Sequence, residues 1–306
     1  MGVLSQLGGF GLVLTGAVLA VSQAPEAIPG IGPAGALKKL YGDFVFTEGP
    51  AADAEGNLFF TDVRASKIYQ VDIEGNLSTF LEDSQGCNGL MFDAEGRLLA
   101  CQGLAKRIIA IDPKTKKVEI LADQYEGRPF DRPNDLVVDR SGGIYFTDPS
   151  VGVVYYVAKG GWVSLVAEGL QRPNGVLLTP DEKHMVLLPS GTPDVLRFPI
   201  ESPGKLGPAE VFCRLEQGET GQPRGGDGLT VDTEGNLYLA QPGLGALQVV
   251  DPQGKTLGLI PVPENPANCA FGGPDNQTLF ITARTSLYAA PMEATGHRFG
   301  SSTEEP

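Results

Sequence analysis

The chain has 306 residues, of which 42% are hydrophobic and 20% are charged, and its formal net charge is −14. This balance argues against disorder, and a closed all-β fold of this length commonly uses the whole chain as one domain. The acidic charge and the lack of any run of Lys and Arg exclude a nucleic-acid partner, and we expect no stable membrane partner. Clustered carboxylates on such a protein can attract a divalent cation.

The first 24 residues carry no charged side chain and contain an apolar run over 10–21. The small-x-small triplet Ser22-Gln23-Ala24 follows this run, so segment 1–24 resembles a secretory signal peptide and favours export to the periplasm or the medium. No Lys or Arg precedes the run, and Pro25 would follow a cut at Ala24. Cleavage after Ala20, an uncleaved short anchor and a cytoplasmic protein therefore stay open as alternatives.

One phrase recurs six times along the rest of the chain: a polar residue, a small or polar residue, an apolar stretch, in most copies an Asp-x-x-Gly turn, and a second apolar stretch. The copies begin at Glu48, Asn88, Asn134, Asn174, Asp227 and Asn268. They are 40, 46, 40, 53 and 41 residues apart, close to the ~40–45 residues of a four-stranded propeller blade. Long helical periodicity is absent. We therefore predict an all-β protein, a six-bladed β-propeller with four-stranded blades over residues 37–292.

The two ends of this region predict how the ring closes. The sixth copy supplies only three strands, near 269–272, 278–282 and 287–290. Segment Leu37 to Thr47 precedes the first copy, and its strand-like part Asp43 to Thr47 is expected to complete the last blade. Residues 293–306 are expected to form a loose polar tail.

The four cysteines are compatible with either a cytoplasmic or an exported protein. Cys87 and Cys101 flank a predicted hairpin and could face one another, so an exported protein could form one disulfide there. Free buried thiols are the alternative. Cys213 and Cys269 have no evident partner, and no zinc-type spacing occurs.

The six repeat starts are expected to ring one mouth of the central channel, because the innermost strand of each blade runs beside the propeller axis. Asn or Asp before Gly also favours turns, which accounts for most of these residues singly but does not predict that they converge. Oxygen-only side chains that include two carboxylates suit a hard cation such as Ca²⁺ or Mg²⁺. His184 and His297 lie away from the repeat starts, and no Gly-x-Ser-x-Gly elbow occurs, so neither an imidazole nor a serine centre is expected.

Four motifs carry a family resemblance: Phe46-Thr47-Glu48-Gly49-Pro50, Arg132-Pro133-Asn134-Asp135, Pro173-Asn174-Gly175 and Gly226-Asp227-Gly228. In this order and at blade spacing, the chain resembles the family of regucalcin, gluconolactonases and luciferin-regenerating enzyme. The resemblance implies lactone hydrolysis in a six-bladed propeller. It also implies a channel cation held by Glu48, Asn134, Asn174 and Asp227, with Arg132 contacting substrate oxygens. Asn88 together with Gln102 is closer to the gluconolactonase-like branch, whereas the signal-like segment departs from the cytosolic members.

These residues support a hypothesis of metal-dependent hydrolysis of a gluconolactone-like sugar lactone. The cation would be Ca²⁺ before Mg²⁺, Mn²⁺ or Zn²⁺, and it would polarise the carbonyl and acidify a water. Asp227 is the candidate general base and Glu48 its competitor. Arg132, Asn134, Asn88 and Gln102 are the candidate substrate contacts.

Several alternatives stay open. Arg132 could instead form an ion pair with Asp131 or Asp135, and Asn88 and Asn268 could serve only turn geometry. The protein could be a metal-stabilised binding scaffold, or a related esterase or phosphotriesterase. The oligomeric state is open.

Overall fold

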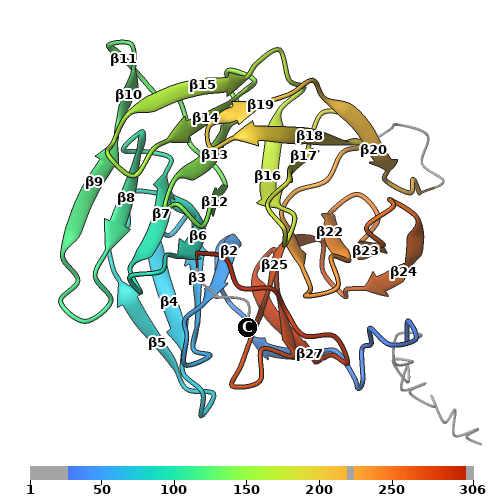
Figure 1. Cartoon of the computed structure of the whole chain (residues 1–306). Coiled ribbons are helices and arrows are strands. Elements are labelled where there is room, and N and C mark those ends of the chain that lie inside the picture. Colours follow the sequence, from blue (N-terminus) through green and yellow to red (C-terminus); the bar gives the residue numbers. More distant parts are fainter. Residues whose placement is uncertain (1–26, 219–223, 301–306) are drawn as a thin grey trace, which may run out of the picture.

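A computed structural model describes residues 27–218 and 224–300 and shows a ring of six antiparallel sheets around a central channel (Figure 1). This confirms the predicted all-β six-bladed propeller. The signal-like segment 1–24 lies outside the described residues. The described residues contain no helix, and hence none long and apolar enough to cross a membrane.

Each blade has its first strand at the channel and its last strand at the rim. Blade 1 consists of β2 (Thr47–Ala52), β3 (Leu58–Asp62), β4 (Lys67–Val71) and β5 (Leu77–Leu81). Blade 2 consists of β6 (Cys87–Phe92), β7 (Leu98–Gln102), β8 (Arg107–Ile111) and β9 (Val118–Ala122). A small hairpin, β10 (Gln124–Tyr125) and β11 (Arg128–Pro129), leads to blade 3. Blade 3 consists of β12 (Leu136–Val138), β13 (Ile144–Asp148), β14 (Val153–Val157) and β15 (Val163–Ala167).

The second half of the ring repeats this order. Blade 4 consists of β16 (Pro173–Leu178), β17 (His184–Pro189), β18 (Asp194–Ser202) and β20 (Glu210–Arg214), with the short β19 (Lys205–Leu206) beside β18. Blade 5 consists of β21 (Leu229–Val231), β22 (Leu237–Gln241), β23 (Ala246–Val250) and β24 (Thr256–Pro261). Blade 6 consists of β25 (Pro266–Gly272), β26 (Thr278–Ala283), β27 (Ser286–Pro291) and β1 (Lys38–Tyr41).

An N-terminal strand closes the ring, but it is not the predicted one. β1 pairs with β27, with Lys39 opposite Tyr288. The predicted strand, Asp43 to Thr47, instead links blade 6 to blade 1. Asp43 has a left-handed φ of 67°, which interrupts an extended strand. The amides of Val45 and Phe46 then donate to the Asp62 carboxylate at 2.7 and 3.0 Å instead of to a neighbouring strand.

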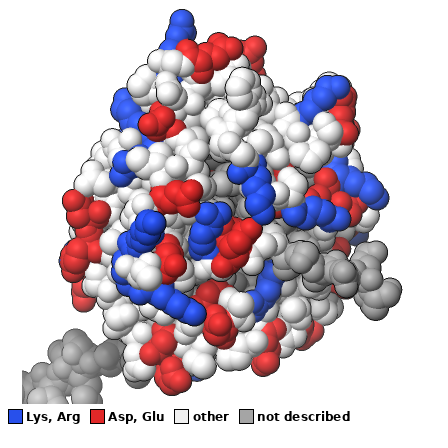
Figure 2. Space-filling view, turned by 60° about the vertical axis from the view of Figure 1, so that its left-hand side comes forward, with Lys and Arg blue, Asp and Glu red and all other residues white. Residues whose placement is uncertain are grey.

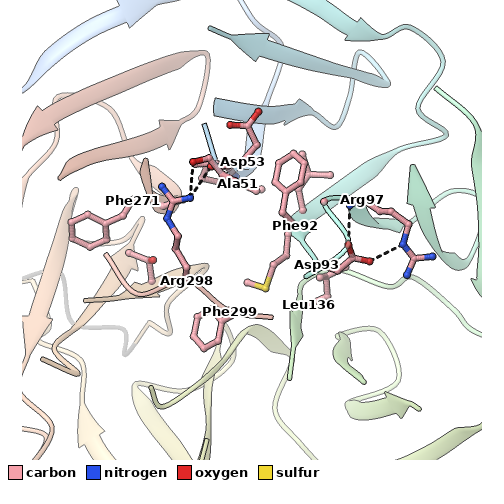
Figure 3. A pocket seen from close by; sticks show the side chains of 18 of the residues that line it. Ala51, Asp53, Phe92, Asp93, Arg97, Leu136, Phe271, Arg298 and Phe299 are labelled. Atoms are coloured by element: carbon pink, nitrogen blue, oxygen red, sulfur yellow. Dashed lines mark hydrogen bonds and ion pairs between the residues drawn. The ribbon is translucent and has the colours of Figure 1, made fainter. Parts of the chain in front are cut away.

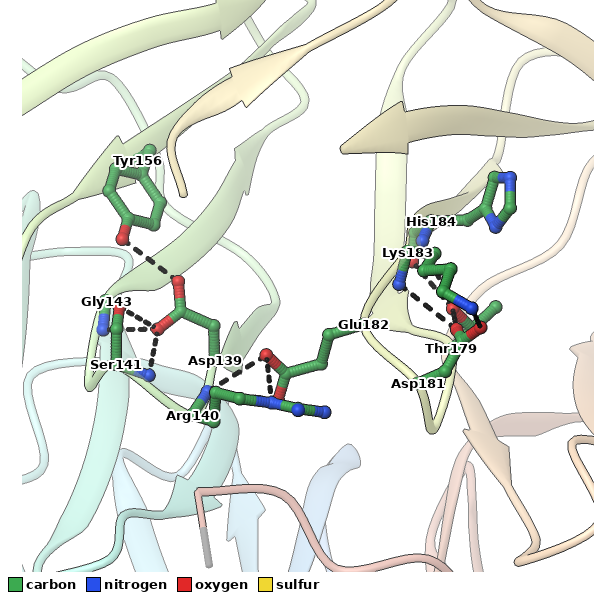
Figure 4. Close-up of polar contacts among 10 residues, drawn as sticks. All are labelled: Asp139, Arg140, Ser141, Gly143, Tyr156, Thr179, Asp181, Glu182, Lys183 and His184. Atoms are coloured by element: carbon green, nitrogen blue, oxygen red, sulfur yellow. Dashed lines mark hydrogen bonds and ion pairs between the residues drawn. The ribbon is translucent and has the colours of Figure 1, made fainter. Parts of the chain in front are cut away.

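Aspartate side chains hold hairpin turns at the end of the propeller opposite the repeat starts. In six turns the Asp Oδ1 accepts the amide of the residue four positions on: Asp53, Asp93, Asp139 and Asp232 after inner strands, and Asp72 and Asp251 between the third and fourth strands of blades 1 and 5. Blade 4 lacks this Asp, and the Oγ1 of Thr179 accepts the amide of His184 at 3.1 Å instead (Figure 4). An ion pair from Arg140 to Glu182 at 3.1 Å joins the turns of blades 3 and 4. The Asp-x-x-Gly phrase is thus a turn signal.

Apolar side chains fill the spaces between adjacent blades. Phe59, for example, lies between Phe80 of its own blade and Phe92 of blade 2, with ring centroids 4.9 and 5.2 Å away. On the face shown in Figure 2, Lys and Arg side chains are interspersed with Asp and Glu and form no continuous basic stripe.

The four cysteines are free and buried. Cys87 lies opposite Gln102 in the register of β6 and β7. Successive residues of a strand point to opposite faces, so Cys101 faces away from Cys87. Accordingly, Cys87 packs between blades 1 and 2, whereas Cys101 packs between blades 2 and 3. Of the two alternatives for these cysteines, the structure therefore shows free buried thiols and not a facing pair.

Candidate active site

The six repeat starts meet at one end of the channel. Four of them lie within the inner strands β2, β6, β16 and β25, whereas Asn134 and Asp227 lie just before β12 and β21. The ring is bonded from blade to blade. The amide of Gly89 donates to the carbonyl of Asn134 at 2.8 Å, and that of Gly175 to the carbonyl of Asp227 at 2.9 Å.

The glycines that follow the repeat starts serve this close approach more than they serve turns. Gly89, Gly175 and Gly228 have no left-handed φ. A Cβ on Gly89 would lie 2.4 Å from the Asp135 carboxylate, and one on Gly228 would lie 2.0 Å from the Asn268 side chain. Only glycine lets the polar group of the next blade come so near. Turn formation therefore does not account for the Asn-Gly and Asp-Gly pairs.

Three carboxylates lie close together at this end. Glu48 and Asp135 are 5% and 8% exposed. Burial raises the pKa of Asp135 to about 7. Burial, and then the charge of Asp135, raise the pKa of Asp227 to about 7. Burial, followed by the charges of Asp227 and Asp135, holds the pKa of Glu48 well above its ordinary value.

None of these three carboxylates belongs to an ion pair formed within residues 27–218 and 224–300. Buried charges normally have a partner, and mutually repelling carboxylates need a positive charge to ionise together. A cation bound here would allow the three carboxylates to ionise together.

Amide side chains orient the carboxylates. Asn174 Nδ2 donates to Asp227 Oδ1 at 2.7 Å and to Ser190 Oγ at 2.9 Å. Ser190 Oγ in turn donates to the carbonyl of Gly226 at 2.9 Å. The Asn268 side chain hydrogen-bonds with both Glu48 and Asp135 and lowers the pKa of each. These bonds leave part of each carboxylate available to a ligand.

The donor set is compatible with a hard divalent cation. Glu48, Asn134, Asn174 and Asp227 offer only oxygen among their acceptor atoms, as Ca²⁺ and Mg²⁺ prefer. Within the described parts of the chain, no three Asp, Glu, His or Cys side chains are grouped as a complete metal site. The proposed set has two carboxylates, and its other ligands are amide oxygens.

The remaining predicted contacts differ in accessibility. Arg132 is exposed at the mouth and forms no ion pair in the described chain, because Asp131 pairs with Lys106 instead at 3.5 Å. Asn88 is half-buried, and its carbonyl accepts the Thr61 hydroxyl at 3.1 Å.

Gln102 does not fit its predicted role as a substrate contact. It is 3% exposed, its Nε2 donates to the carbonyl of Ser84 at 3.0 Å, and its Oε1 accepts from Arg107. Both ends of its amide are already used inside blade 2, because the alternation of β7 turns Gln102 toward Cys87.

Sequence reasoning did not assign a site role to Asp135 or Ser190. The sequence does contain an indication of a role for Asp135. It is the only acidic residue that directly follows a repeat start, and four of the other five copies have Gly at this position. Ser190 has no such indication, because it joins the site from the end of β17, far from any repeat start.

A cavity of about 540 Å³ lies at the turn end of the inner strands and also touches Asp135 and Asn268. Its lining mixes apolar side chains, such as Phe92, Leu136, Phe271 and Phe299, with charged ones, such as Asp53, Asp93, Arg97 and Arg298 (Figure 3).

Residues 293–300 cross this end, where a loose tail was expected over 293–306, whereas residues 301–306 lie outside the described residues. The His297 amide donates to the carbonyl of Val231 in blade 5 at 3.0 Å. Arg298 Nη1 donates to the carbonyls of Asp53 and Ala54 in blade 1, both at 3.1 Å. Residues 293–300 therefore form an ordered cap. Its apolar Phe299 packs on the interblade core.

Comparisons with known proteins agree with this geometry. Residues 46–285 match the family model described as SMP-30/Gluconolactonase/LRE-like region. The chain belongs to this family. Among curated relatives, a gluconolactonase of Zymomonas mobilis is 30% identical over 286 residues, covering 81% of this chain and 78% of that protein.

Solved structures of the SMP-30/gluconolactonase family share the fold. A gluconolactonase from Xanthomonas campestris superposes with a TM-score of 0.76 at 28% identity, covering 84% of this chain and 89% of that one. Regucalcin from Agrobacterium tumefaciens, a calcium-binding protein, superposes with a TM-score of 0.73 at 22% identity, covering 86% and 94%. At that identity the second likeness supports the fold alone.

Proposed function

We propose that this protein hydrolyses a sugar lactone of the gluconolactone type to its aldonic acid, with a divalent cation bound in the channel. The observation that carries the proposal is the cluster of Glu48, Asp135 and Asp227, three carboxylates without a cationic partner in the described chain. The gluconolactonase relatives support the reaction class.

Glu48, Asn134, Asn174 and Asp227 would hold the cation, with Ca²⁺ favoured and Mg²⁺, Mn²⁺ or Zn²⁺ as alternatives. When bound, the cation would polarise the lactone carbonyl and lower the pKa of a water molecule. It would also relieve the repulsion between the carboxylates.

The Asp227 carboxylate would accept the proton of the attacking water. Asn174 fixes Oδ1 through its 2.7 Å hydrogen bond, so Oδ2 remains free for the proton. The water oxygen bonds to the carbonyl carbon, the ring C–O bond then breaks, and the proton passes to the departing ring oxygen. The pKa of about 7 is that of the metal-free carboxylate. A bound cation would lower this pKa, so the cation would supply most of the activation of the water. Glu48, held by Asn268, is the second candidate for this role.

Arg132 and Asn88 would orient the substrate. Arg132 is exposed at the mouth and offers several donors in one planar fork, which suits hydroxyl and carbonyl oxygens. Asp135 would act through Glu48 and Asn268, because its charge and its hydrogen bond to Asn268 influence the position and protonation of Glu48.

The test is a panel of lactones, aryl esters and phosphotriesters assayed by acid release after exhaustive chelation, with Ca²⁺, Mg²⁺, Mn²⁺ or Zn²⁺ added back. We expect gluconolactone turnover that chelation removes and a cation restores. Turnover that survives chelation would exclude the metal role. Turnover of esters alone would indicate a related esterase, and no turnover with any cation would indicate a binding scaffold.

We also propose that the protein is exported, which rests on the signal-like composition of residues 1–24. Fractionation of cells that express the full chain, with mass determination of the mature N-terminus, tests this proposal.

A further inference from the structure

Ser190 is a half-buried residue that connects blades 4 and 5 at the repeat-start end. It directly follows β17. Its Oγ accepts a hydrogen bond from Asn174 Nδ2 at 2.9 Å and donates one to the carbonyl of Gly226 at 2.9 Å. Asn174 is the repeat start of blade 4, and Gly226 directly precedes Asp227, the repeat start of blade 5. One hydroxyl thus touches both segments that carry proposed cation ligands.

The direction of the Ser190 hydroxyl decides which atom of the Asn174 amide it can meet. A serine hydroxyl has a single hydrogen, and here the carbonyl of Gly226 accepts it. The Ser190 oxygen therefore presents only lone pairs to Asn174, which accept a hydrogen from the amide nitrogen and would repel the amide oxygen. Because its one hydrogen is donated to a main-chain carbonyl, Ser190 acts as a positioning residue and not as a nucleophile.

The other hydrogen of the Asn174 amide also has a partner. Nδ2 donates it to Asp227 Oδ1 at 2.7 Å. An asparagine amide has two N–H donors and one oxygen, so the nitrogen is fully used. Turned over about its last bond, the amide would place its oxygen against both the Ser190 oxygen and the Asp227 carboxylate. Only one orientation satisfies both neighbours, and it leaves Oδ1, the atom that can bind a cation, to another ligand.

The main chain on both sides of Ser190 is fixed for this contact. The amide of Ser190 donates to the carbonyl of Arg172 at 2.9 Å, and the amide of Gly226 donates to the carbonyl of Pro189 at 3.0 Å. A Cβ on Gly225 would lie 2.1 Å from the Pro189 carbonyl oxygen. Only glycine there lets the segment that leads into blade 5 lie against the end of β17. The hydroxyl is therefore held in place from two blades.

Other hydroxyls at the repeat-start end have a different kind of partner. Those of Thr61, Thr147 and Thr282 donate to main-chain carbonyls of repeat starts at 2.8–3.3 Å. Such bonds hold the backbone of the ring. Ser190 instead contacts the side-chain amide of Asn174, so the loss of its hydroxyl changes the setting of the ligand group itself.

We propose that Ser190 is a positioning residue that sets the orientation of the Asn174 amide and thereby raises the affinity of the channel for its divalent cation. This inference rests on the proposed function and adds a residue to its cation site. Removal of a group that orients a metal ligand commonly weakens metal binding by about 10–100-fold.

The test is the Ca²⁺ dissociation constant of Ser190→Ala, measured by calorimetry on the full chain after chelation. We expect it to rise roughly tenfold, because the amide can then turn its nitrogen toward the cation. The Ca²⁺ concentration for half-maximal lactone turnover should rise by the same factor, while kcat at saturating Ca²⁺ stays close to the wild-type value. Ser190→Thr keeps a hydroxyl and should restore most of the affinity. Ser190→Cys, whose sulfur is a weak acceptor, should show an intermediate rise.

The matched control is Thr256→Val. The Thr256 hydroxyl also accepts a side-chain amide, that of Gln248 at 2.8 Å, but it lies on the outermost strand of blade 5. This variant should bind Ca²⁺ as the wild type does. An unchanged dissociation constant in Ser190→Ala and Ser190→Cys, or an equal rise in Thr256→Val, would overturn the inference while leaving the lactonase function intact. A wild-type protein that binds none of Ca²⁺, Mg²⁺, Mn²⁺ and Zn²⁺ would overturn the proposed cation site, and this inference with it.

Discussion

The two ends of the central channel use the same charged residue types in opposite ways. At the turn end, charges have local partners: Asp93 accepts the Arg97 amide and pairs with its guanidinium at 2.8 Å. At the repeat-start end, Glu48, Asp135 and Asp227 have no ion-pair partner in the described chain. Unsatisfied charges cost stability, so proteins keep them where a ligand completes them. On this difference we base the proposal that the repeat-start end is the reaction site.

The largest expected effect comes from removing one unpaired charge. Asp227→Asn should lower lactone kcat by about a thousandfold, because it removes the proposed base and a cation ligand. Folding should persist, since the change also removes a repelling carboxylate. The measurement is turnover with saturating Ca²⁺ and Mg²⁺, alongside thermal unfolding.

Asp251→Asn is the matched control, because Asp251 only holds a turn between outer strands, through the amide of Lys255 at 2.9 Å. It should keep its activity. Full turnover in Asp227→Asn would show that the carboxylates at the repeat-start end do not take part in the reaction.

The second-largest expected effect comes from disturbing the close packing of the repeat-start ring. Gly228→Ala places a Cβ against the Asn268 side chain and should cost about 1–3 kcal/mol of unfolding free energy. It should also reduce lactone turnover, because Asn268 holds Glu48. Urea unfolding and kcat/KM check both effects.

The control is Gly160→Ala, where a Cβ would meet nothing within 4 Å. Equal stability of the two variants would show that the ring is looser than described.

The cap should matter for stability and not for turnover. Phe299 is half-buried against the interblade core, so Phe299→Ala should cost about 1–2 kcal/mol, less than for a fully buried Phe. Gluconolactone kcat/KM should not change. A large loss of kcat/KM at unchanged stability would indicate that substrate also uses the turn end.

A smaller effect concerns pH in the absence of divalent cations. Burial raises the folded-state pKa of Asp135 and Asp227 to about 7, above the ~3.9 of an unfolded Asp. The folded state therefore binds more protons, so its stability should fall as the pH rises from about 4 through about 7. Added Ca²⁺ should raise the unfolding temperature more at pH 8 than at pH 5. Equal shifts at both pH values would mean that Ca²⁺ does not bind this cluster.

The fold and most of the candidate site could be predicted from the repeat. The spacing of the copies shows which residues occupy equivalent positions in the six blades, at the same distance from the propeller axis. The predicted convergence of Glu48, Asn134, Asn174 and Asp227 needed no side-chain detail. The wrong predictions concern features that depend on the register of a single residue or on a single backbone dihedral angle. Gln102 is turned inward by strand alternation, and Asp43 bends the chain so that β1 closes the ring instead.

Other features depend on contacts between distant segments, which a single sequence does not reveal. Ser190 reaches Asn174 from another strand, and Arg284 comes to Thr47 from the opposite end of the chain. The cap was not predicted, because a polar composition is typical of a tail and gives no information on which groups its backbone hydrogen-bonds to. His297 bonds to the end of strand β21 in blade 5, and Arg298 bonds to the first turn of blade 1.

The pairing of β1 with β27 has a consequence for biosynthesis. Lys39 is made early and its partner Tyr288 near the end of translation, so blade 6 cannot assemble while the chain is still emerging. Five blades can form in turn from local hairpins, but β1 must wait for a strand about 250 residues later, and such long-range pairing is slow. The nascent protein is therefore an open ring with an unpaired edge until its last strands arrive, and such an edge is prone to pair wrongly.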